Sequence, residues 1–139
     1  TVALRMRQHC ANAEYVVDFL KKHKEVTKVI YSTEHDKPIA DRAKKYLRGG
    51  NGPMIGIELK GGIEAGKKFI ESLKMFYHVA NIGDARSLAI HPAITTHSQL
   101  TEDELIAAGV TPGYVRLSIG IEHPDDIISD LDQALNQAN

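Results

Sequence analysis

The stretch Tyr114-Val115-Arg116-Leu117-Ser118-Ile119 predicts a β-strand with two unlike faces. Alternate side chains of a strand point to opposite faces of the sheet, so Val115, Leu117 and Ile119 form an apolar face. Arg116 then lies on the other, polar face. An arginine fixed on a rigid strand is well placed to bind both oxygens of a carboxylate. The stretch therefore predicts a sheet and an anion-binding position on it.

The rest of the chain alternates between helices and short strands. Apolar residues at steps of three and four predict a long helix over 2–23, and Thr101 with Glu104 has the capping-box spacing of a short helix that ends near Gly109. Further helices are predicted over 39–47, 63–76 and from Pro124 onward, and further strands over 27–31, 54–59, 78–81 and 88–91. Several connections are too short for helical crossovers. The expected fold is an α/β two-layer sandwich, with a small, largely antiparallel sheet covered by helices.

Composition limits the function classes. The 139 residues, 42% of them apolar, fit a single domain over 1–139. The net charge of −1, from 17 basic and 18 acidic residues, gives no basis for binding nucleic acid or an anionic membrane. Cys10 is the single cysteine and no apolar run could span a bilayer, so we expect a cytoplasmic protein. The start at Thr1, directly before helical periodicity, favours a domain of a longer protein.

Two other kinds of site compete with the anion-binding strand. Residues 61–68, Gly-Gly-Ile-Glu-Ala-Gly-Lys-Lys, have the G-x-x-x-x-G-K frame of a phosphate-binding loop. Lys68 replaces the hydroxyl residue that would bind magnesium, and Glu64 places a carboxylate where phosphate oxygens would lie, so a tight turn explains the glycines better. His91, His97 and His123 are the best metal candidates, but their spacings match no helical pair or compact Cys/His module. We expect neither a nucleotide nor a metal.

Several segments between residues 78 and 123 together carry a family resemblance. They are Gly83-Asp84-Ala85-Arg86-Ser87-Leu88, His91-Pro92, Thr95-Thr96-His97-Ser98-Gln99, Gly109-Val110-Thr111-Pro112 and Val115-Arg116-Leu117-Ser118-Ile119-Gly120-Ile121-Glu122. These segments resemble the C-terminal domain of the Cys/Met-metabolism enzymes that use pyridoxal phosphate. Within this family the chain is most similar to the O-acetylhomoserine sulfhydrylases.

The resemblance implies roles for individual residues. In this family the matching arginine holds the α-carboxylate of the amino-acid substrate and a serine contacts the same group, which implies Arg116 and Ser87 as substrate-binding residues. Arg86 stands where relatives that act on cystathionine carry an acidic residue, and this difference favours the sulfhydrylases. Arg86, Thr95, Thr96 and His97 are candidates for the substrate entrance. No residue of the chain is expected to be catalytic.

Ordinary structural roles remain open for the same residues. Arg116 could pair with a nearby carboxylate on a half-exposed strand, and the hydroxyl of Ser87 could bond to its own backbone. Thr95, Thr96 and His97 could form a loop fixed by bonds from hydroxyl to backbone. Ile94 departs from the family pattern, in which a small polar residue is common, so no polar contact is assigned there.

The resemblance also implies a cofactor that this chain does not hold alone. Pyridoxal phosphate needs a Schiff-base lysine and an acidic partner for its ring nitrogen, and in the family both precede the matched region. Thr27-Lys28 resembles the Ser/Thr-Lys of such enzymes but opens a predicted strand at the wrong place. We therefore expect the N-terminal cofactor-binding domain to be absent and the isolated chain to be inactive.

The implied activity belongs to the full-length enzyme, expected to be a homo-oligomer, a tetramer. It converts O-acetylhomoserine and sulfide into homocysteine and acetate, and the C-terminal domain orients the substrate through Arg116 and Ser87. The alternatives are a cystathionine γ-synthase or a γ-lyase of the same superfamily. From another class, a noncatalytic module could bind small anions or a partner protein through the face that carries Arg116.

Overall fold

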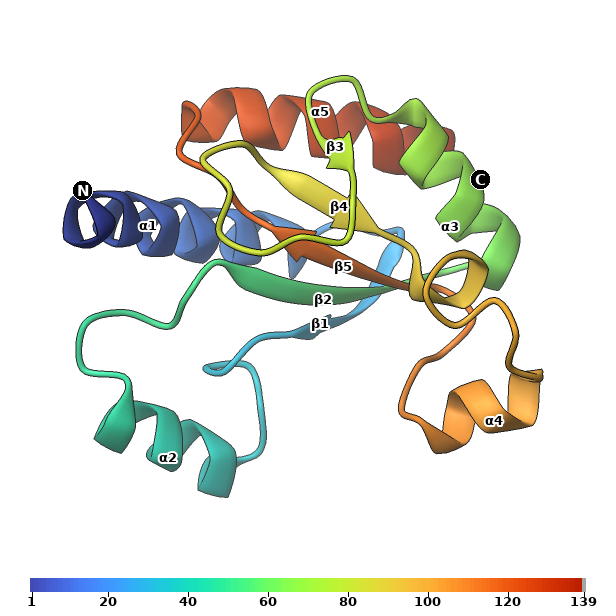
Figure 1. Cartoon of the computed structure of the whole chain (residues 1–139), viewed down its shortest axis with the longest axis horizontal. Coiled ribbons are helices and arrows are strands. Elements are labelled where there is room, and N and C mark those ends of the chain that lie inside the picture. Colours follow the sequence, from blue (N-terminus) through green and yellow to red (C-terminus); the bar gives the residue numbers. More distant parts are fainter. Residues whose placement is uncertain (139) are drawn as a thin grey trace.

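A five-stranded sheet forms the centre of the computed structural model, which describes residues 1–138 (Figure 1). Its strands are β1 (Val26–Ile30), β2 (Met54–Leu59), β3 (Tyr77–His78), β4 (Leu88–Ile90) and β5 (Tyr114–Ser118), in the spatial order β1-β2-β5-β4-β3. Neighbouring strands run antiparallel except for β3 and β4, which are parallel. The predicted α/β sandwich with a largely antiparallel sheet is confirmed.

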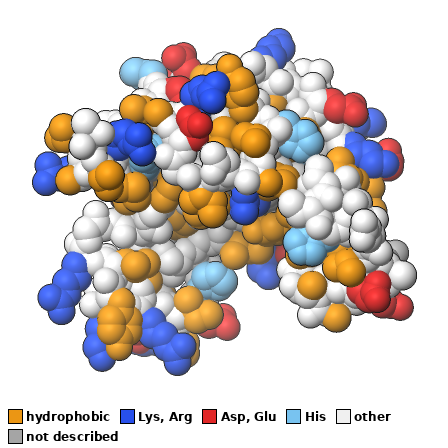
Figure 2. All heavy atoms as spheres, viewed as in Figure 1, with side chains coloured by type: hydrophobic (Ala, Val, Ile, Leu, Met, Phe, Trp, Pro, Cys, Tyr) orange, Lys and Arg blue, Asp and Glu red, His pale blue; other side chains and the backbone are white. Residues whose placement is uncertain are grey.

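The helices cover one face of the sheet and leave the other more open. Helices α1 (Val2–Leu20), α3 (Gly62–Ser72) and α5 (Pro124–Gln137) lie together on one side, whereas α2 (Lys37–Tyr46) and α4 (Glu102–Ala107) lie on the opposite side (Figure 1). A short 3-10 helix, η1 (Pro92–Ile94), follows β4. With side chains added, α2 and α4 form two lobes with a hollow between them (Figure 2). The central strands border this hollow.

The core lies between the sheet and the layer of α1, α3 and α5. Strand β5 contributes Val115, Leu117 and the following Ile119, all with 0% exposure, so its predicted apolar face is confirmed. The helices contribute stripes at steps of three and four, which comprise Ala13, Val17 and Leu20 of α1, Ala65 and Phe69 of α3, and Ile127, Leu131 and Leu135 of α5. The core thus holds β5 rigidly and aims its alternate side chains at the open face.

Helix α3 ends earlier than the predicted 63–76, at Ser72. The carboxylate of Asp130 on α5 accepts hydrogen bonds from the backbone N–H groups of Lys74 and Met75 at 2.9 and 2.8 Å, and from that of Phe76 at 3.3 Å. These donors are therefore turned toward a neighbouring helix instead of toward the preceding turn of α3. The chain leaves α3 as an extended segment that leads into β3.

The glycines of residues 61–68 have structural explanations. Gly61 and Gly62 have φ angles of 109° and 65°, a region that residues with a Cβ rarely adopt, and they make the tight turn from β2 into α3. A Cβ at Gly66 would overlap the ring of His91. Lys67 pairs with Glu64 at 2.8 Å on the helix surface. The sequence frame of a phosphate loop therefore coincides with a turn and a close packing contact.

Within residues 1–138, no helix combines the length and the apolar character that crossing a membrane requires.

Candidate substrate-binding site around Arg116

Arg116 lies in the middle of β5, on the open face of the sheet. It pairs with Gly56 of β2 on one side and with Ile90 of β4 on the other. Gly56 leaves space that the ring of Tyr114 occupies, since a Cβ on Gly56 would lie 2.7 Å from Cε2 of that ring. Tyr114 and Arg116 are two residues apart on one strand and share a face. On the predicted polar face of β5, the phenol ring of Tyr114 and the guanidinium of Arg116 therefore lie next to each other.

The guanidinium of Arg116 has one anchored donor and one unused donor. Its Nη2 donates a hydrogen bond to the backbone carbonyl of Asn81 at 3.2 Å. Its Nε is buried and has no hydrogen-bond partner among the described residues. A buried donor without an acceptor is costly, and a carboxylate is the acceptor that fits the planar fork of arginine. The guanidinium is thus held through Nη2, while its Nε–H has no partner among the described residues.

A groove of about 410 Å³ opens beside Arg116, between the sheet and the segment that leads into and out of α2. Tyr114, His35 and Ser32 give it polar groups, and Ile39, Met54 and Ile55 are among its apolar residues. Burial raises the pKa of the Tyr114 hydroxyl, and the positive charge of Arg116 opposes this shift. Tyr114 therefore stays protonated at neutral pH and can donate a hydrogen bond into the groove.

Ser87 is not among the residues that line the groove beside Arg116. Its side chain is fully buried, with 0% exposure. The hydroxyl donates to Oε2 of Glu122 at 2.9 Å and accepts from the backbone N–H of Gly120 at 2.9 Å. Leu88 and Ile90 pair with Ser118 and Arg116 and share their face, so Ser87 points to the helix-covered side. In this chain the Ser87 hydroxyl is thus bonded to Glu122 and Gly120, and its predicted role in substrate binding stays a prediction.

Arg86 lies on the surface, away from the groove. Its guanidinium stacks over the ring of Tyr77 at 4.1 Å, and its Nε contacts Oδ1 of Asp84 at 3.4 Å. The backbone N–H of Arg86 donates to the same carboxylate, and this bond is the largest cause of the lowered pKa of Asp84. Arg86 lines a separate hollow of about 610 Å³ together with Lys74 and Glu122. If Arg86 contacts an entering substrate, it would do so in that hollow and not in the groove beside Arg116.

The candidate entrance residues after η1 form a bonded loop. The hydroxyl of Thr95 donates to the carbonyl of His91 at 2.8 Å, and the hydroxyl of Thr96 lies 2.8 Å from Nδ1 of His97. None of these three residues lines the groove beside Arg116. The alternative of a loop fixed by hydroxyl-to-backbone bonds describes Thr95, whereas Thr96 is exposed.

Asn81 and Glu122 are two residues of this region to which the sequence prediction gave no role. Asn81 holds Arg116 through its backbone carbonyl, and a backbone contact leaves no mark in the side-chain pattern. Glu122 closes the quoted Arg-Leu-Ser-Ile-Gly-Ile-Glu segment, and its carboxylate accepts from both the N–H and the hydroxyl of Ser87. The sequence feature that could have indicated a role for Glu122 is its position, three residues after the predicted strand 114–119.

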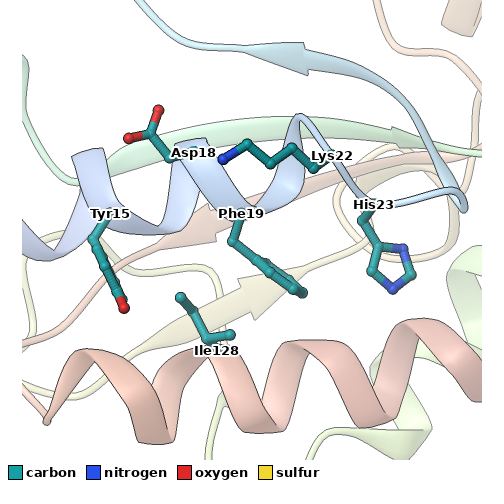
Figure 3. A pocket seen from close by; sticks show the side chains of 6 residues that line it. All are labelled: Tyr15, Asp18, Phe19, Lys22, His23 and Ile128. Carbon is teal, nitrogen blue, oxygen red and sulfur yellow. The ribbon is translucent and has the colours of Figure 1, made fainter.

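Another hollow, of about 470 Å³, lies between α1 and α5 (Figure 3). Phe19 and Ile128 point into the space between the two helices, and Tyr15, Asp18, Lys22 and His23 surround it. These residues belong to the helix layer and its edge, whereas Arg116 projects from the opposite face of the sheet. The hollow is therefore separate from the Arg116 site.

Nearly the whole chain is similar to enzymes of one family. Residues 1–136 match the family described as Cys/Met metabolism PLP-dependent enzyme. The O-acetyl-L-homoserine sulfhydrylase of Leptospira meyeri is 54% identical over 136 residues, which cover 97% of this chain and 31% of that protein. The L-methionine gamma-lyase of Fusobacterium nucleatum subsp. nucleatum is 46% identical over 137 residues, which cover 99% of this chain and 34% of that protein.

A solved structure has the same fold. The crystal structure of a protein described as an O-acetylhomoserine (thiol)-lyase from Campylobacter jejuni superimposes with a TM-score of 0.88 at 41% identity. The match covers 96% of this chain and 32% of that one, and the crystallised protein carries pyridoxal phosphate attached to a lysine. The present chain therefore spans about a third of the length of these similar proteins.

Proposed function

Because the chain belongs to the Cys/Met-metabolism family of enzymes that depend on pyridoxal phosphate, we propose that it is the C-terminal domain of an O-acetylhomoserine sulfhydrylase. The full-length enzyme would exchange the acetate on the γ-carbon of O-acetylhomoserine for sulfide, giving homocysteine and acetate. The relatives with this name that match nearly the whole chain support the assignment. As a working expectation, the full-length enzyme is a homotetramer.

The observation that supports the substrate-binding part of the proposal is the guanidinium of Arg116, which lines an open groove and has an Nε–H without a partner among the described residues. In this proposal the guanidinium binds the α-carboxylate of the substrate while Nη2 stays bonded to the carbonyl of Asn81. The fixed strand holds the substrate in one orientation, so that the γ-carbon is presented to the reacting groups. The protonated hydroxyl of Tyr114 can donate to a second substrate oxygen in the groove.

The groove does not by itself provide a site for the cofactor. Pyridoxal phosphate supplies an electron sink and is held through a lysine and an acidic partner. The described residues that line the groove include neither a lysine nor a carboxylate. We therefore place the cofactor contacts in a part of the enzyme outside this chain, and we expect the isolated chain to be inactive.

A γ-lyase of the same family is the second candidate, because methionine γ-lyases are similar to this chain at 43–46% identity. Such an enzyme eliminates the γ-substituent without replacing it and releases a 2-oxo acid and ammonia. The carboxylate-binding role of Arg116 would be the same in both enzymes. The assignment to a sulfhydrylase thus depends on sequence similarity and not on the geometry of this domain.

An assay of the full-length protein that contains this chain separates the candidates. With O-acetylhomoserine and sulfide, a sulfhydrylase forms homocysteine and acetate in equal amounts, and product formation requires sulfide. Production of ammonia and a 2-oxo acid from methionine at a comparable kcat/KM would identify the γ-lyase instead. The isolated chain serves as the control and should form neither set of products.

A further inference from the structure

A polar cluster of buried and half-buried residues lies behind the Arg116 site, on the helix-covered side of the sheet. It consists of Asn12, Ser87, Gly120 and Glu122, and we refer to it as the Glu122 cluster. Oε1 of Glu122 accepts from the backbone N–H of Ser87 at 2.6 Å, and Oε2 accepts from its hydroxyl at 2.9 Å. The same hydroxyl accepts from the N–H of Gly120 at 2.9 Å. Glu122 and Ser87 thus join the end of β5 to the start of β4.

Helix α1 fixes the backbone of this cluster. Nδ2 of Asn12 donates to the carbonyls of Gly120 at 3.1 Å and of Glu122 at 2.8 Å. One residue before Gly120, the carbonyl of Ile119 lies 2.6 Å from Nδ1 of His9, which is also buried. The peptide from 119 to 122 is therefore tied to a helix of the core. Its position does not depend on solvent-exposed contacts.

The cluster in turn fixes the loop before β4, which reaches Arg116. The N–H of Ile121 donates to the carbonyl of Ala85 at 2.9 Å. Further along the loop, the N–H of Gly83 donates to the hydroxyl of Ser118 at 3.3 Å. Two residues before Gly83, the carbonyl of Asn81 accepts from the guanidinium of Arg116. Hydrogen bonds at both ends of the loop, joined by its covalent chain from 81 to 87, therefore connect α1 and Glu122 with the guanidinium of Arg116.

Close packing at Gly120 makes the arrangement specific. A Cβ at Gly120 would overlap the carboxylate of Glu122 and would lie 2.5 Å from the carbonyl of Ala85. Only glycine allows the carboxylate and the loop to approach the strand end this closely. Gly120 therefore allows the loop before β4 to approach closely, and Glu122 binds that loop through Ser87.

We propose that Glu122 is a positioning residue for substrate binding, which acts on Arg116 through the loop 81–87. This inference rests on the proposed function, because it assumes that Arg116 binds the substrate carboxylate. Loss of the Glu122 carboxylate releases Ser87 and lets the loop move, so that Asn81 no longer holds Nη2 of the guanidinium. A binding group that shifts by a fraction of an ångström loses affinity even though it is still present.

The test uses Glu122→Ala, Glu122→Gln and Ser87→Ala in the full-length enzyme with its cofactor. We expect Glu122→Ala to raise KM for the amino-acid substrate about tenfold, with a smaller change in kcat. Glu122→Gln should restore part of the affinity, because an amide oxygen can still accept from the N–H of Ser87. Ser87→Ala and Glu122→Ala should not be additive, because both remove the same bonded unit. Glu71→Gln, on the exposed surface of α3, is the matched control and should leave KM unchanged.

Hydrogen exchange gives a readout that does not depend on activity. In Glu122→Ala the backbone amides of residues 81–87 should exchange faster, whereas those of β2 should not. Faster exchange with an unchanged KM would overturn the proposal, since Glu122 would then only stabilise the loop. If Glu122→Ala does not fold, Glu122→Gln and Ser87→Ala decide the question by the same two measurements.

The two levels of inference fail in different ways. If Arg116→Ala leaves KM unchanged, the proposed carboxylate-binding role is wrong, and the positioning role falls with it. If Arg116→Ala raises KM while the variants at Glu122 and Ser87 do not, only the positioning role is wrong.

Discussion

Replacement of Arg116 tests the substrate-binding role most directly. In the folded domain its guanidinium offers the buried Nε–H, while Nη2 is already bonded to Asn81. Arg116→Ala removes a charge-assisted pair to the substrate carboxylate, which is worth about 2–5 kcal/mol in a partly desolvated site. This loss corresponds to a fall in kcat/KM of roughly 30-fold to several-thousand-fold. Arg116→Lys keeps the charge but loses the planar fork, and we expect a loss of about 1–2 kcal/mol, or roughly five- to thirtyfold.

The assay is steady-state kinetics of the full-length enzyme with O-acetylhomoserine, together with the absorbance of the bound cofactor. Because no cofactor contact is assigned to Arg116, the absorbance should not change in either variant. Arg7→Ala, on the exposed surface of α1, provides a control for the loss of one surface arginine. An Arg116→Ala enzyme with a near-normal kcat/KM would show that Arg116 is an ordinary strand arginine.

Four further predictions concern the domain itself. Gly66→Ala should destabilise the chain by about 1–3 kcal/mol in urea unfolding, since the new methyl group overlaps the ring of His91. ATP with magnesium should not raise the melting temperature of the chain. A magnesium-dependent rise would support nucleotide binding by residues 61–68. Burial lowers the pKa of His91 below its ordinary value of 6.5, so the folded state takes up its proton less readily than the unfolded state. The resulting stability is complete above pH 6.5 and falls as the pH drops below it, and His91→Gln should remove this part of the pH dependence of the unfolding free energy. Asp130→Ala should cost about 2–3 kcal/mol, because three backbone N–H groups lose a charged acceptor; an unchanged urea midpoint would contradict the reason given for the end of α3.

Much of the fold could be predicted because local signals decided it. The alternation along β5 matches its burial, and Thr101 accepts from the N–H of Glu104 as the capping-box spacing required. Pro124 begins α5 as predicted, since proline suits the first turn of a helix. In each case the residues that determine the element lie within one or two turns of it. The residues near each of these elements in the sequence are therefore sufficient to predict it.

Boundaries set by distant residues could not be predicted in this way. The end of α3 depends on Asp130, which is 56 residues from Lys74 along the chain. The predicted apolar stripe of α1 begins at Ala3 and Met6, yet Ala3 is exposed and Met6 is only half-buried. Nothing within either helix indicates these limits, since tertiary contacts impose them. In the site, the position of Arg116 follows from the local pattern of its own strand, whereas the position of Asn81 depends on the loop that contacts Arg116.

Ser87 shows why the orientation of a residue beside a recognisable motif could not be predicted from the sequence. Strand β4 is buried on both of its faces, so Leu88, Ala89 and Ile90 are all apolar and the alternation that identified the faces of β5 is missing. The face on which Ser87 lies is decided only by the register, in which Leu88 pairs with Ser118 and Ile90 with Arg116. A register shifted by one residue would have brought the Ser87 hydroxyl to the same face as Arg116. The actual register instead turns it toward Glu122, where it fixes the loop that reaches Arg116. The pairing of β4 with β5 therefore decides the surroundings of Ser87, which the sequence pattern of β4 does not show.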